Sequence, residues 1–157
     1  MTDDSDRARM VGINHVALAV GDTERAREFY ESIFDVEIRG ETDSGLFLDM
    51  GDQFLALSET DEAGDASDAH RHFGLVVDDA DLVEERLADE GIEPLDTRGL
   101  DVRDPWGNRI QIVEYDEIQF TKADHVLVGM DLSDLEKSES ALEELAEKGM
   151  APSEDRG

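Results

Sequence analysis

Residues 14–22 read NHVALAVGD, and residues 71–79 read RHFGLVVDD. In both stretches a histidine, His15 or His72, stands seven residues before an aspartate, with an apolar run between them. A short apolar run is typical of a buried β-strand, and an aspartate in front of an amphipathic pattern is typical of a helix N-cap. The repeat therefore predicts a duplicated strand–helix unit in which each copy supplies one histidine to a shared interior.

The residues that follow predict the rest of each copy. In the first copy we expect a strand, a helix and three further strands over the ranges 13–20, 24–34, 36–41, 45–50 and 53–58. In the second copy we expect the same order over the ranges 70–77, 79–90, 92–95, 100–103 and 109–115. Two helices are too few for a doubly wound parallel sheet, whereas strands joined by hairpins fit mixed sheets. The predicted fold class is α+β, with two paired βαβββ modules and a C-terminal helical extension.

Composition divides the chain around this duplicated unit. We expect a disordered polar leader (1–10), module one (11–58), an acidic linker (59–68), module two (69–115) and a C-terminal extension (116–157). The two modules and their linker make up one domain. In the extension, leucines and alanines at helical spacing predict an amphipathic helix from 134 to 148, capped by Ser133 or Asp134 and ended by Gly149. Its polar face is acidic, so we expect it to pack on the domain or on a second subunit rather than on a membrane.

Charge is the most unusual bulk property of the chain. It has 14 basic and 42 acidic residues, a net charge of −28, and its only lysines are Lys122, Lys137 and Lys148. Scattered acids of this number repel one another at ordinary ionic strength, and molar salt shortens the screening length to about 3 Å. The composition therefore predicts a cytoplasmic protein of a halophile.

The same composition excludes several classes of function. Nucleic-acid binding requires a basic surface, and an anionic membrane would repel this chain. There is no cysteine, which removes disulfides, thiolate metal ligands and a cysteine nucleophile. The first ten residues contain no apolar signal core, and no apolar stretch approaches the about 20 residues that span a bilayer.

The two histidine stretches and a third phrase, DPWGNRI at residues 104–110, together resemble the vicinal oxygen chelate superfamily. This superfamily contains glyoxalase I, extradiol dioxygenases, methylmalonyl-CoA epimerase, fosfomycin-resistance thiol transferases and bleomycin-binding proteins. The resemblance covers roughly residues 11–115. It implies two half-barrels of curved sheet around a divalent ion (Zn, Mn, Fe, Ni or Mg), a substrate that chelates the ion through neighbouring oxygens, and a homodimer.

The resemblance also implies which residues bind the metal. His15 and His72 match the histidine ligands on the first strand of each module. His70 lies two residues before His72 on the same strand face, nearer to the equivalent histidine of the fosfomycin-resistance enzymes, so either can be the second ligand. We favour His72 because its spacing to Asp79 repeats that of the first copy. A packed core role is the alternative for each strand histidine, and a solvated strand end is the alternative for His70.

The chain departs from the superfamily at the third ligand. A glutamate usually ends the third phrase, but this chain has Gln111 at that position. Counting from Gly51, the analogous residue of module one is Leu55, which cannot bind a metal. An amide oxygen is neutral and does not offset the charge of a dication, so His15, His72 and Gln111 would make a weaker site. The change also removes the obvious general base.

Other side chains are weaker candidates. We consider as proton donors or as a substitute acid the residues Tyr30, Asp49 and Tyr115. For holding an anionic substrate or lining its cavity we consider Arg103, Arg109 and Trp106. Core packing, a surface role or pairing with the abundant acids is the alternative for each of them.

Three functions remain open on the sequence. The first is a divalent-metal-dependent enzyme acting on a small oxygen-chelating substrate, of the lyase, isomerase, dioxygenase or transferase type. The second is a metal-free ligand-binding protein of the bleomycin-resistance type, which Gln111 favours and the histidine pair does not. The third is an interaction or regulatory domain in which both histidines are core residues.

Overall fold

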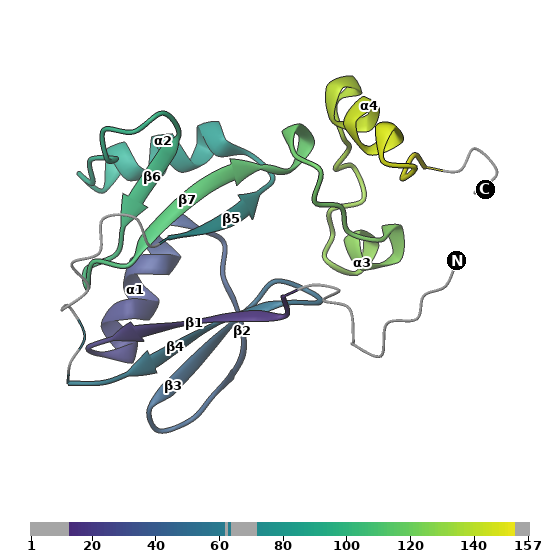
Figure 1. The fold of residues 1–157 in the computed structure, drawn as a ribbon. Helices are drawn as coiled ribbons and strands as arrows, with labels where there is room; N and C mark the ends of the chain where they lie inside the picture. Colours follow the sequence, from purple (N-terminus) through teal and green to yellow (C-terminus); the bar gives the residue numbers. More distant parts are fainter. Residues whose placement is uncertain (1–12, 62, 64–71, 153–157) are drawn as a thin grey trace, which may run out of the picture.

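The computed structural model describes residues 13–61, 63 and 72–152, which form two sheets, their covering helices and a helical extension (Figure 1). Module one runs through β1 (His15–Val20), α1 (Thr23–Ile33), β2 (Glu37–Glu41), β3 (Gly45–Asp49) and β4 (Phe54–Glu59). Module two runs through β5 (Phe73–Val77), α2 (Ala80–Asp89), β6 (Leu100–Arg103) and β7 (Arg109–Glu114). The extension holds the 3₁₀ turn η1 (Tyr115–Glu117), α3 (Asp124–Gly129) and α4 (Glu139–Glu147).

Both sheets are mixed, which confirms the α+β class. The first sheet has the strand order β1-β4-β3-β2 and the second the order β5-β7-β6. In each, the first strand of the module pairs parallel with the last, and the remaining pairs are antiparallel. This shared topology makes β1 equivalent to β5 and β4 equivalent to β7.

The helix starts are duplicated in detail. The side chain of Asp22 accepts hydrogen bonds from the second and third backbone N–H groups of α1, and that of Asp79 accepts one from the third N–H of α2. The first N–H of each helix is held by a glutamate at the end of the last strand. Glu59 accepts from the α1 amide at 3.0 Å, and Glu114 from the α2 amide at 2.7 Å. Each helix start therefore has local and cross-sheet acceptors for amides that lack intrahelical partners.

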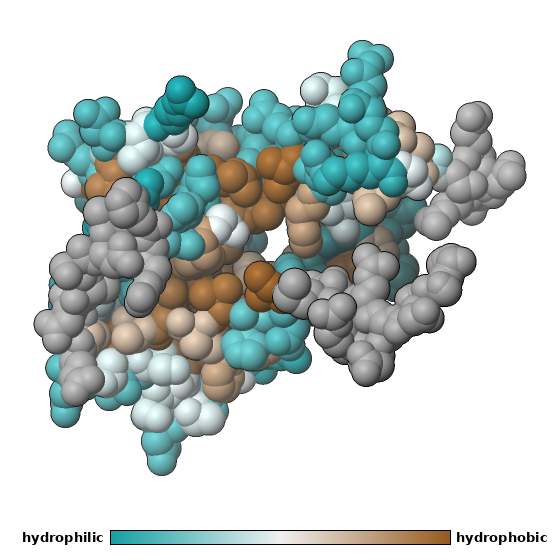
Figure 2. Space-filling model, in the orientation of Figure 1, coloured by the Kyte–Doolittle hydropathy of each residue, from teal (hydrophilic) through white to brown (hydrophobic). Residues whose placement is uncertain are grey.

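Alternation along the strands gives each sheet two faces. One face packs against the helices and forms a single core that joins the modules: Val20, Ala26, Tyr30, Ile33, Leu46, Leu48, Leu55, Leu57, Leu75, Val83, Leu87, Val102, Trp106, Ile110 and Ile112. In Figure 2 hydrophobic residues gather in the middle of the view and hydrophilic ones cover the rim. The opposite face carries His15 in the first sheet and His72 in the second, and we call it the histidine face.

The turn at residues 104–108 locks the modules together. The buried carboxylate of Asp104 accepts hydrogen bonds from the backbone N–H groups of Trp106 and Asn108, from the Asn108 side chain and from the Tyr30 hydroxyl of α1. The Asn108 side chain also donates to the Ala19 carbonyl of β1 at 2.9 Å. This part of the DPWGNRI phrase is thus structural, since it ties module two to both α1 and β1.

The extension is fixed by the three lysines. Lys122 donates to the Met50 carbonyl at 2.9 Å and to the Asp52 carboxylate in the β3–β4 turn. Lys137 lies 3.6 Å from the centre of the Tyr115 ring and donates to the Tyr115 carbonyl and to two further carbonyls of residues 118–120. Lys148 donates to the side chain of Gln119. All three ammonium groups therefore hold the extension to itself or to module one.

Two expectations about local structure are wrong, and one helix was not expected. Residues 92–95 form no strand, because Pro94 lacks the N–H that a ladder needs; the Leu95 N–H alone reaches the Asp101 carbonyl. The extension helix begins at Glu139, capped by Ser138 instead of Ser133 or Asp134, although Gly149 (φ 77°) follows its end as expected. The helix α3 was not foreseen, since six residues give no readable periodicity.

The other predicted elements lie within two residues of the observed ones where the structure describes both ends. The leader at 1–10, most of the linker and His70 lie outside the described residues. Among the helices that the structure describes, none has both the length and the apolar character to cross a bilayer.

Candidate metal and ligand site

The histidine face of the second sheet carries two rows of mostly polar side chains. Arg103 and Arg109 are direct cross-strand partners, and His72 continues their row because Phe73 pairs with Ile110. In the next row Gly74 pairs with Gln111, and Gln111 pairs with Asp101. Three adjacent strands therefore bring together an imidazole, two guanidinium groups, an amide and a carboxylate.

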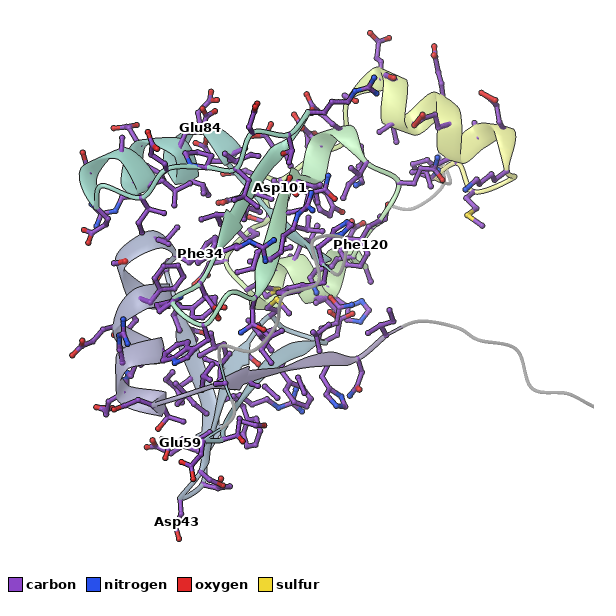
Figure 3. All side chains as sticks on the ribbon, turned by 60° about the vertical axis from the view of Figure 1, so that its left-hand side comes forward. Phe34, Asp43, Glu59, Glu84, Asp101 and Phe120 are labelled. Atoms are coloured by element: carbon purple, nitrogen blue, oxygen red, sulfur yellow. The ribbon has the colours of Figure 1, made fainter. Side chains whose placement is uncertain are left out.

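Asp101 is the most buried polar group of these rows. It is 2% exposed, and only its Oδ2 atom is paired, with Arg109 Nη2 at 2.7 Å and Nε at 2.8 Å. Its other oxygen, Oδ1, is buried and accepts no hydrogen bond from the described residues. In Figure 3 Asp101 lies inside the molecule, whereas Asp43 projects from the loop at its lower end. A buried oxygen without a donor is costly, so Oδ1 is poised for a partner.

Two glycines leave space beside these polar groups. A Cβ atom added to Gly74 would meet nothing within 4 Å, so the face is open between His72 and Gln111. A Cβ atom added to Gly99 would lie 3.4 Å from Gln111 Nε2 and 3.5 Å from Asp101 Oδ1. The amide nitrogen and the unpartnered oxygen therefore point toward the same place. Next to the start of β6, Gln111 and Gly99 line an open groove of about 380 Å³ that continues to the start of α2.

The histidine face of the first sheet is different. His15 is exposed, stacks on Phe54 with ring centroids 4.8 Å apart, and donates a hydrogen bond from Nδ1 to Asn14 Oδ1 at 2.7 Å. Asp49 continues this row beyond Phe54 and accepts from the Gly51 N–H. The residue equivalent to Gln111 is Ala56, because Ala17 pairs with Ala56 as Gly74 pairs with Gln111. The earlier count to Leu55 is wrong by one residue, and Leu55 instead points into the core.

The two histidines lie on different sheets of the chain. Figure 1 shows β1 and β5 pointing in opposite directions, so the strands begin at opposite ends. The contact between Asn108 and Ala19 brings the start of β7, and with it His72, toward the end of β1. His15 is four residues back along the extended strand, about 13 Å from Ala19. Within one chain the structure thus joins His72 with Gln111 and leaves His15 apart.

The weaker candidates occupy varied positions. Tyr30 is 1% exposed and donates to Asp104 Oδ2 at 3.1 Å; burial, and then the charge of Asp104, raise its pKa well above the usual value. Tyr115 is 4% exposed beneath Lys137, and its hydroxyl accepts the Lys122 N–H. Trp106 is buried in the core against Gly21 and under Arg25. Of the weaker candidates, only Asp49, Arg103 and Arg109 lie on a histidine face.

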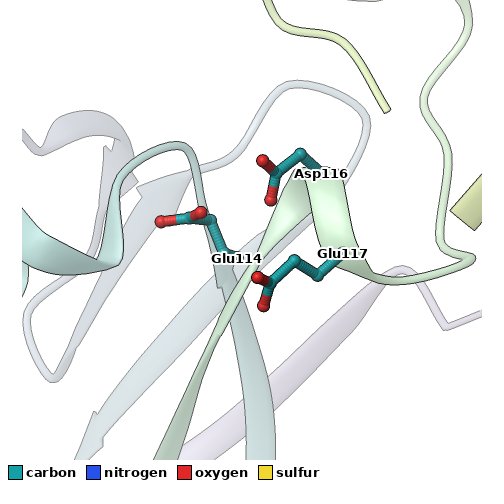
Figure 4. A group of neighbouring side chains, drawn as sticks. All are labelled: Glu114, Asp116 and Glu117. Carbon is teal, nitrogen blue, oxygen red and sulfur yellow. The ribbon is translucent and has the colours of Figure 1, made fainter. Parts of the chain in front are cut away.

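A carboxylate cluster was missed by the sequence analysis. Glu114, Asp116 and Glu117 place one oxygen each within 4.8 Å of one another where β7 passes into η1 (Figure 4). The Ala80 N–H favours the charged form of Glu114, but burial and the neighbouring Asp116 and Glu117 outweigh it and raise the pKa of Glu114. The close spacing of three acids in the sequence is a signal, but acids are too common in this chain for that signal to stand out.

Comparison with known proteins decides the family. The model of the Glyoxalase/Bleomycin resistance protein/Dioxygenase superfamily matches residues 12–112. The chain belongs to this superfamily. A curated relative, the metallothiol transferase FosB of Staphylococcus saprophyticus, is 28% identical over 96 residues, which are 59% of this chain and 64% of the relative. The match therefore spans less than two thirds of that enzyme.

Solved structures of the superfamily have the same fold. A glyoxalase family protein from Bacillus anthracis is 27% identical with a TM-score of 0.58, and the match covers 69% of this chain and 98% of that one. The fosfomycin resistance protein FosX from Mesorhizobium loti is 22% identical with a TM-score of 0.56, covering 67% and 92%. At that identity the likeness to FosX shows the fold alone.

The donor set of module two fits the divalent cation that the superfamily resemblance implies. His72 offers an imidazole nitrogen and Gln111 an amide oxygen, both of which are metal ligands. The buried Asp101 carboxylate lies beside them, with one oxygen paired to Arg109 and the other without a donor among the described residues. The open space over Gly74 gives room for an ion on this face.

Proposed function

We propose that this protein is a divalent-metal-dependent enzyme acting on a small substrate that chelates the metal through neighbouring oxygens. The reaction would be of the lyase, isomerase, dioxygenase or transferase type. One observation carries the proposal: His72 and Gln111 flank open space over Gly74, beside the buried and unpartnered Asp101 oxygen. The naming of the curated relative as a metallothiol transferase is consistent with a metal-dependent reaction.

We further propose that two chains complete the site as a homodimer. His15 lies at the free start of β1, which is an edge strand, and β5 is the edge strand of the other sheet. In a two-fold dimer each site would combine His72 and Gln111 of one chain with His15 of the second. Two equivalent sites would then form across the same interface.

The residues around the metal have separable roles in this proposal. When bound, the metal would polarise the substrate oxygens as a Lewis acid. Arg103 and Arg109 are cross-strand partners of like charge, and the Asp101 carboxylate pairs with Arg109. We infer that they orient an anionic group of the substrate. Asp49 lies on the face of His15, on the other side of Phe54 in the same row, and would enter the shared site together with that histidine.

Metal content tests the proposal. Protein purified in molar salt without chelator should carry close to one divalent ion per chain by elemental analysis. Replacing both histidines, His15→Ala with His72→Ala, should remove the ion without unfolding the chain. The proposal would be contradicted if the wild-type protein is metal-free and also takes up no added Zn²⁺, Mn²⁺, Fe²⁺, Ni²⁺ or Mg²⁺.

Mixing single variants tests the shared site. His15→Ala and His72→Ala chains, each unable to bind metal alone, should recover about a quarter of the wild-type metal when unfolded together and refolded, because mixed dimers keep one intact site. Each variant refolded alone is the control. If binding does not recover although light scattering shows a dimer, the site lies within one chain.

The second candidate is a metal-free ligand-binding protein. Gln111 and the pair Arg103 and Arg109 favour it, because a neutral amide and two guanidinium groups suit an organic anion without a metal. Replacing Gln111→Glu separates the two candidates. The change should tighten Zn²⁺ binding by restoring a carboxylate if a native metal site exists, and should leave it undetectable if the face binds organic anions only.

We also propose that the protein works in the high-salt cytoplasm of a halophile. Its net charge of −28 supports this setting. Between dilute buffer and molar KCl the midpoint of thermal unfolding should rise by about 10 °C or more, because salt screens the repulsion between the acidic side chains. A midpoint that does not change with salt would contradict it.

A further inference from the structure

The residue that replaces the superfamily glutamate has a buried acid as its cross-strand neighbour. Asp101 on β6 pairs directly with Gln111 on β7, so their Cβ atoms are about 5 Å apart on the same face. No such acid exists at the equivalent place in module one, where Ala56 pairs with Phe47. A carboxylate is therefore present one strand away from position 111, where it pairs with Arg109 through one of its two oxygens.

Only one of the two oxygens of the Asp101 carboxylate has hydrogen-bond partners among the described residues. Arg109 binds Oδ2 through two nitrogens, while Oδ1 has no donor among the described residues although the residue is 2% exposed. Leaving a buried acceptor unpaired lowers the stability of the folded protein, and the loss is larger for a charged group. Gln111 is the direct cross-strand neighbour of Asp101 and carries N–H groups, and its Nε2 atom and Oδ1 lie near the same position next to Gly99 without a hydrogen bond between them.

A hydrogen bond between these atoms would also set the direction of the amide. Gln111 has Nε2 on one side and Oε1 on the other. If Nε2 donates toward β6, Oε1 turns toward β5, where Gly74 leaves the face open beside His72. Hydrogen bonding to an anion also raises the electron density of the amide oxygen, as outer-shell acids do for histidine ligands.

We propose that Asp101 and Gln111 act as one unit that replaces the glutamate: a rotation of the Gln111 side chain brings its amide N–H to Asp101 Oδ1, which accepts it, and the Gln111 oxygen is thereby aimed at a cation over Gly74. Asp101 is a positioning residue in this scheme, since it acts through Gln111. The role of the cation rests on the proposed function above. The hydrogen bond itself does not.

Metal affinity tests the unit. Titration of the full chain with Mn²⁺, followed by the loss of the free-ion electron paramagnetic resonance signal, should show about 10- to 100-fold weaker binding for Asp101→Asn. The double change Asp101→Asn with Gln111→Glu returns the charge to position 111 and should recover binding to within about threefold of wild type. Asp43→Asn removes the same charge from an exposed loop and should leave binding unchanged. Equal Mn²⁺ affinity of wild type and Asp101→Asn would overturn the proposal.

The side-chain amide signals of Gln111 give a readout that needs no metal. They are identified in a ¹⁵N–¹H spectrum as the pair that disappears in Gln111→Glu. In the wild type one of the two protons should be shifted downfield and protected from exchange, and Asp101→Asn should return it toward free glutamine. A solvent-like pair in the wild type would overturn the proposal even if Mn²⁺ binds. A protected pair in a chain that binds no Mn²⁺ would uphold the hydrogen bond and refute the metal function instead.

Discussion

Modules one and two share a backbone plan and differ on the face that carries the histidine. In module one His15 stacks on its cross-strand neighbour Phe54, whereas in module two the cross-strand neighbour of His72 is Arg109. Where module one has Ala56, module two has Gln111 beside Asp101. The caps, the glutamates at the strand ends and the parallel pairing of first and last strands are the same in both. Duplication therefore supplied the scaffold twice, whereas the polar chemistry is concentrated in one copy.

The largest expected difference between the modules is at the equivalent positions Arg109 and Phe54. Arg109→Met leaves the buried Asp101 without its cation and should lower the free energy of unfolding by about 3 kcal/mol. Phe54→Met keeps an apolar side chain and loses mainly the ring contacts, which should cost about 1 kcal/mol. Urea unfolding in molar salt measures both, and equal losses would show that the Asp101 pair contributes nothing special.

The turns before the last strands should differ next. Asp104→Asn places N–H donors against the Tyr30 hydroxyl and the Asn108 amide and should cost about 2 kcal/mol. The counterpart in module one is Asp52→Asn, which removes an exposed pair with Lys122 and should cost about 0.5 kcal/mol. If the two losses are the same in urea unfolding, the turn at 104–108 does not join the modules as described.

The smallest difference concerns the glutamates that hold the helix starts. Only Glu114 has two acids beside it, and its raised pKa means that the folded protein binds that proton more tightly than the unfolded chain. The stability that this proton provides is present at low pH and lost as pH rises through the usual pKa of glutamate and then the raised one. Glu117→Gln should reduce this loss.

The measurement is unfolding of Glu117→Gln and wild type from about pH 4 to about pH 7, where the variant should gain about 0.5 kcal/mol or less at the upper end. Glu136→Gln, an exposed change in the extension, is the control for net charge. A gain that is equal at both ends, or equal in the control, would mean that Glu117 does not act on Glu114.

Features that depend on neighbouring residues in the chain could be predicted. The helix caps Asp22 and Asp79 and the strands around the two histidines follow from local patterns, and so does the side of β7 on which Glu114 lies. The expected strand at 92–95 failed because apolar character was given more weight than the missing N–H of Pro94.

Features that depend on register across strands could not be predicted. Asp101 looked like one of many surface acids, and only its pairing with Gln111 and Arg109 shows that it is buried on the histidine face. The same pairing corrected the counterpart of Gln111 from Leu55 to Ala56. Alternation assigns a residue to a face, but the neighbours on that face come from strands distant in sequence.

The placement of the three lysines has a consequence for the chemistry of amines. Every side-chain amine of the protein belongs to Lys122, Lys137 or Lys148, and each one holds the extension in place. Acylation of lysine removes the charge and with it the bonds to carbonyls and carboxylates. A reagent or enzyme that acylates lysines would therefore act on one region only. It would loosen the extension from the β3–β4 turn and leave the side chains of both histidine faces untouched.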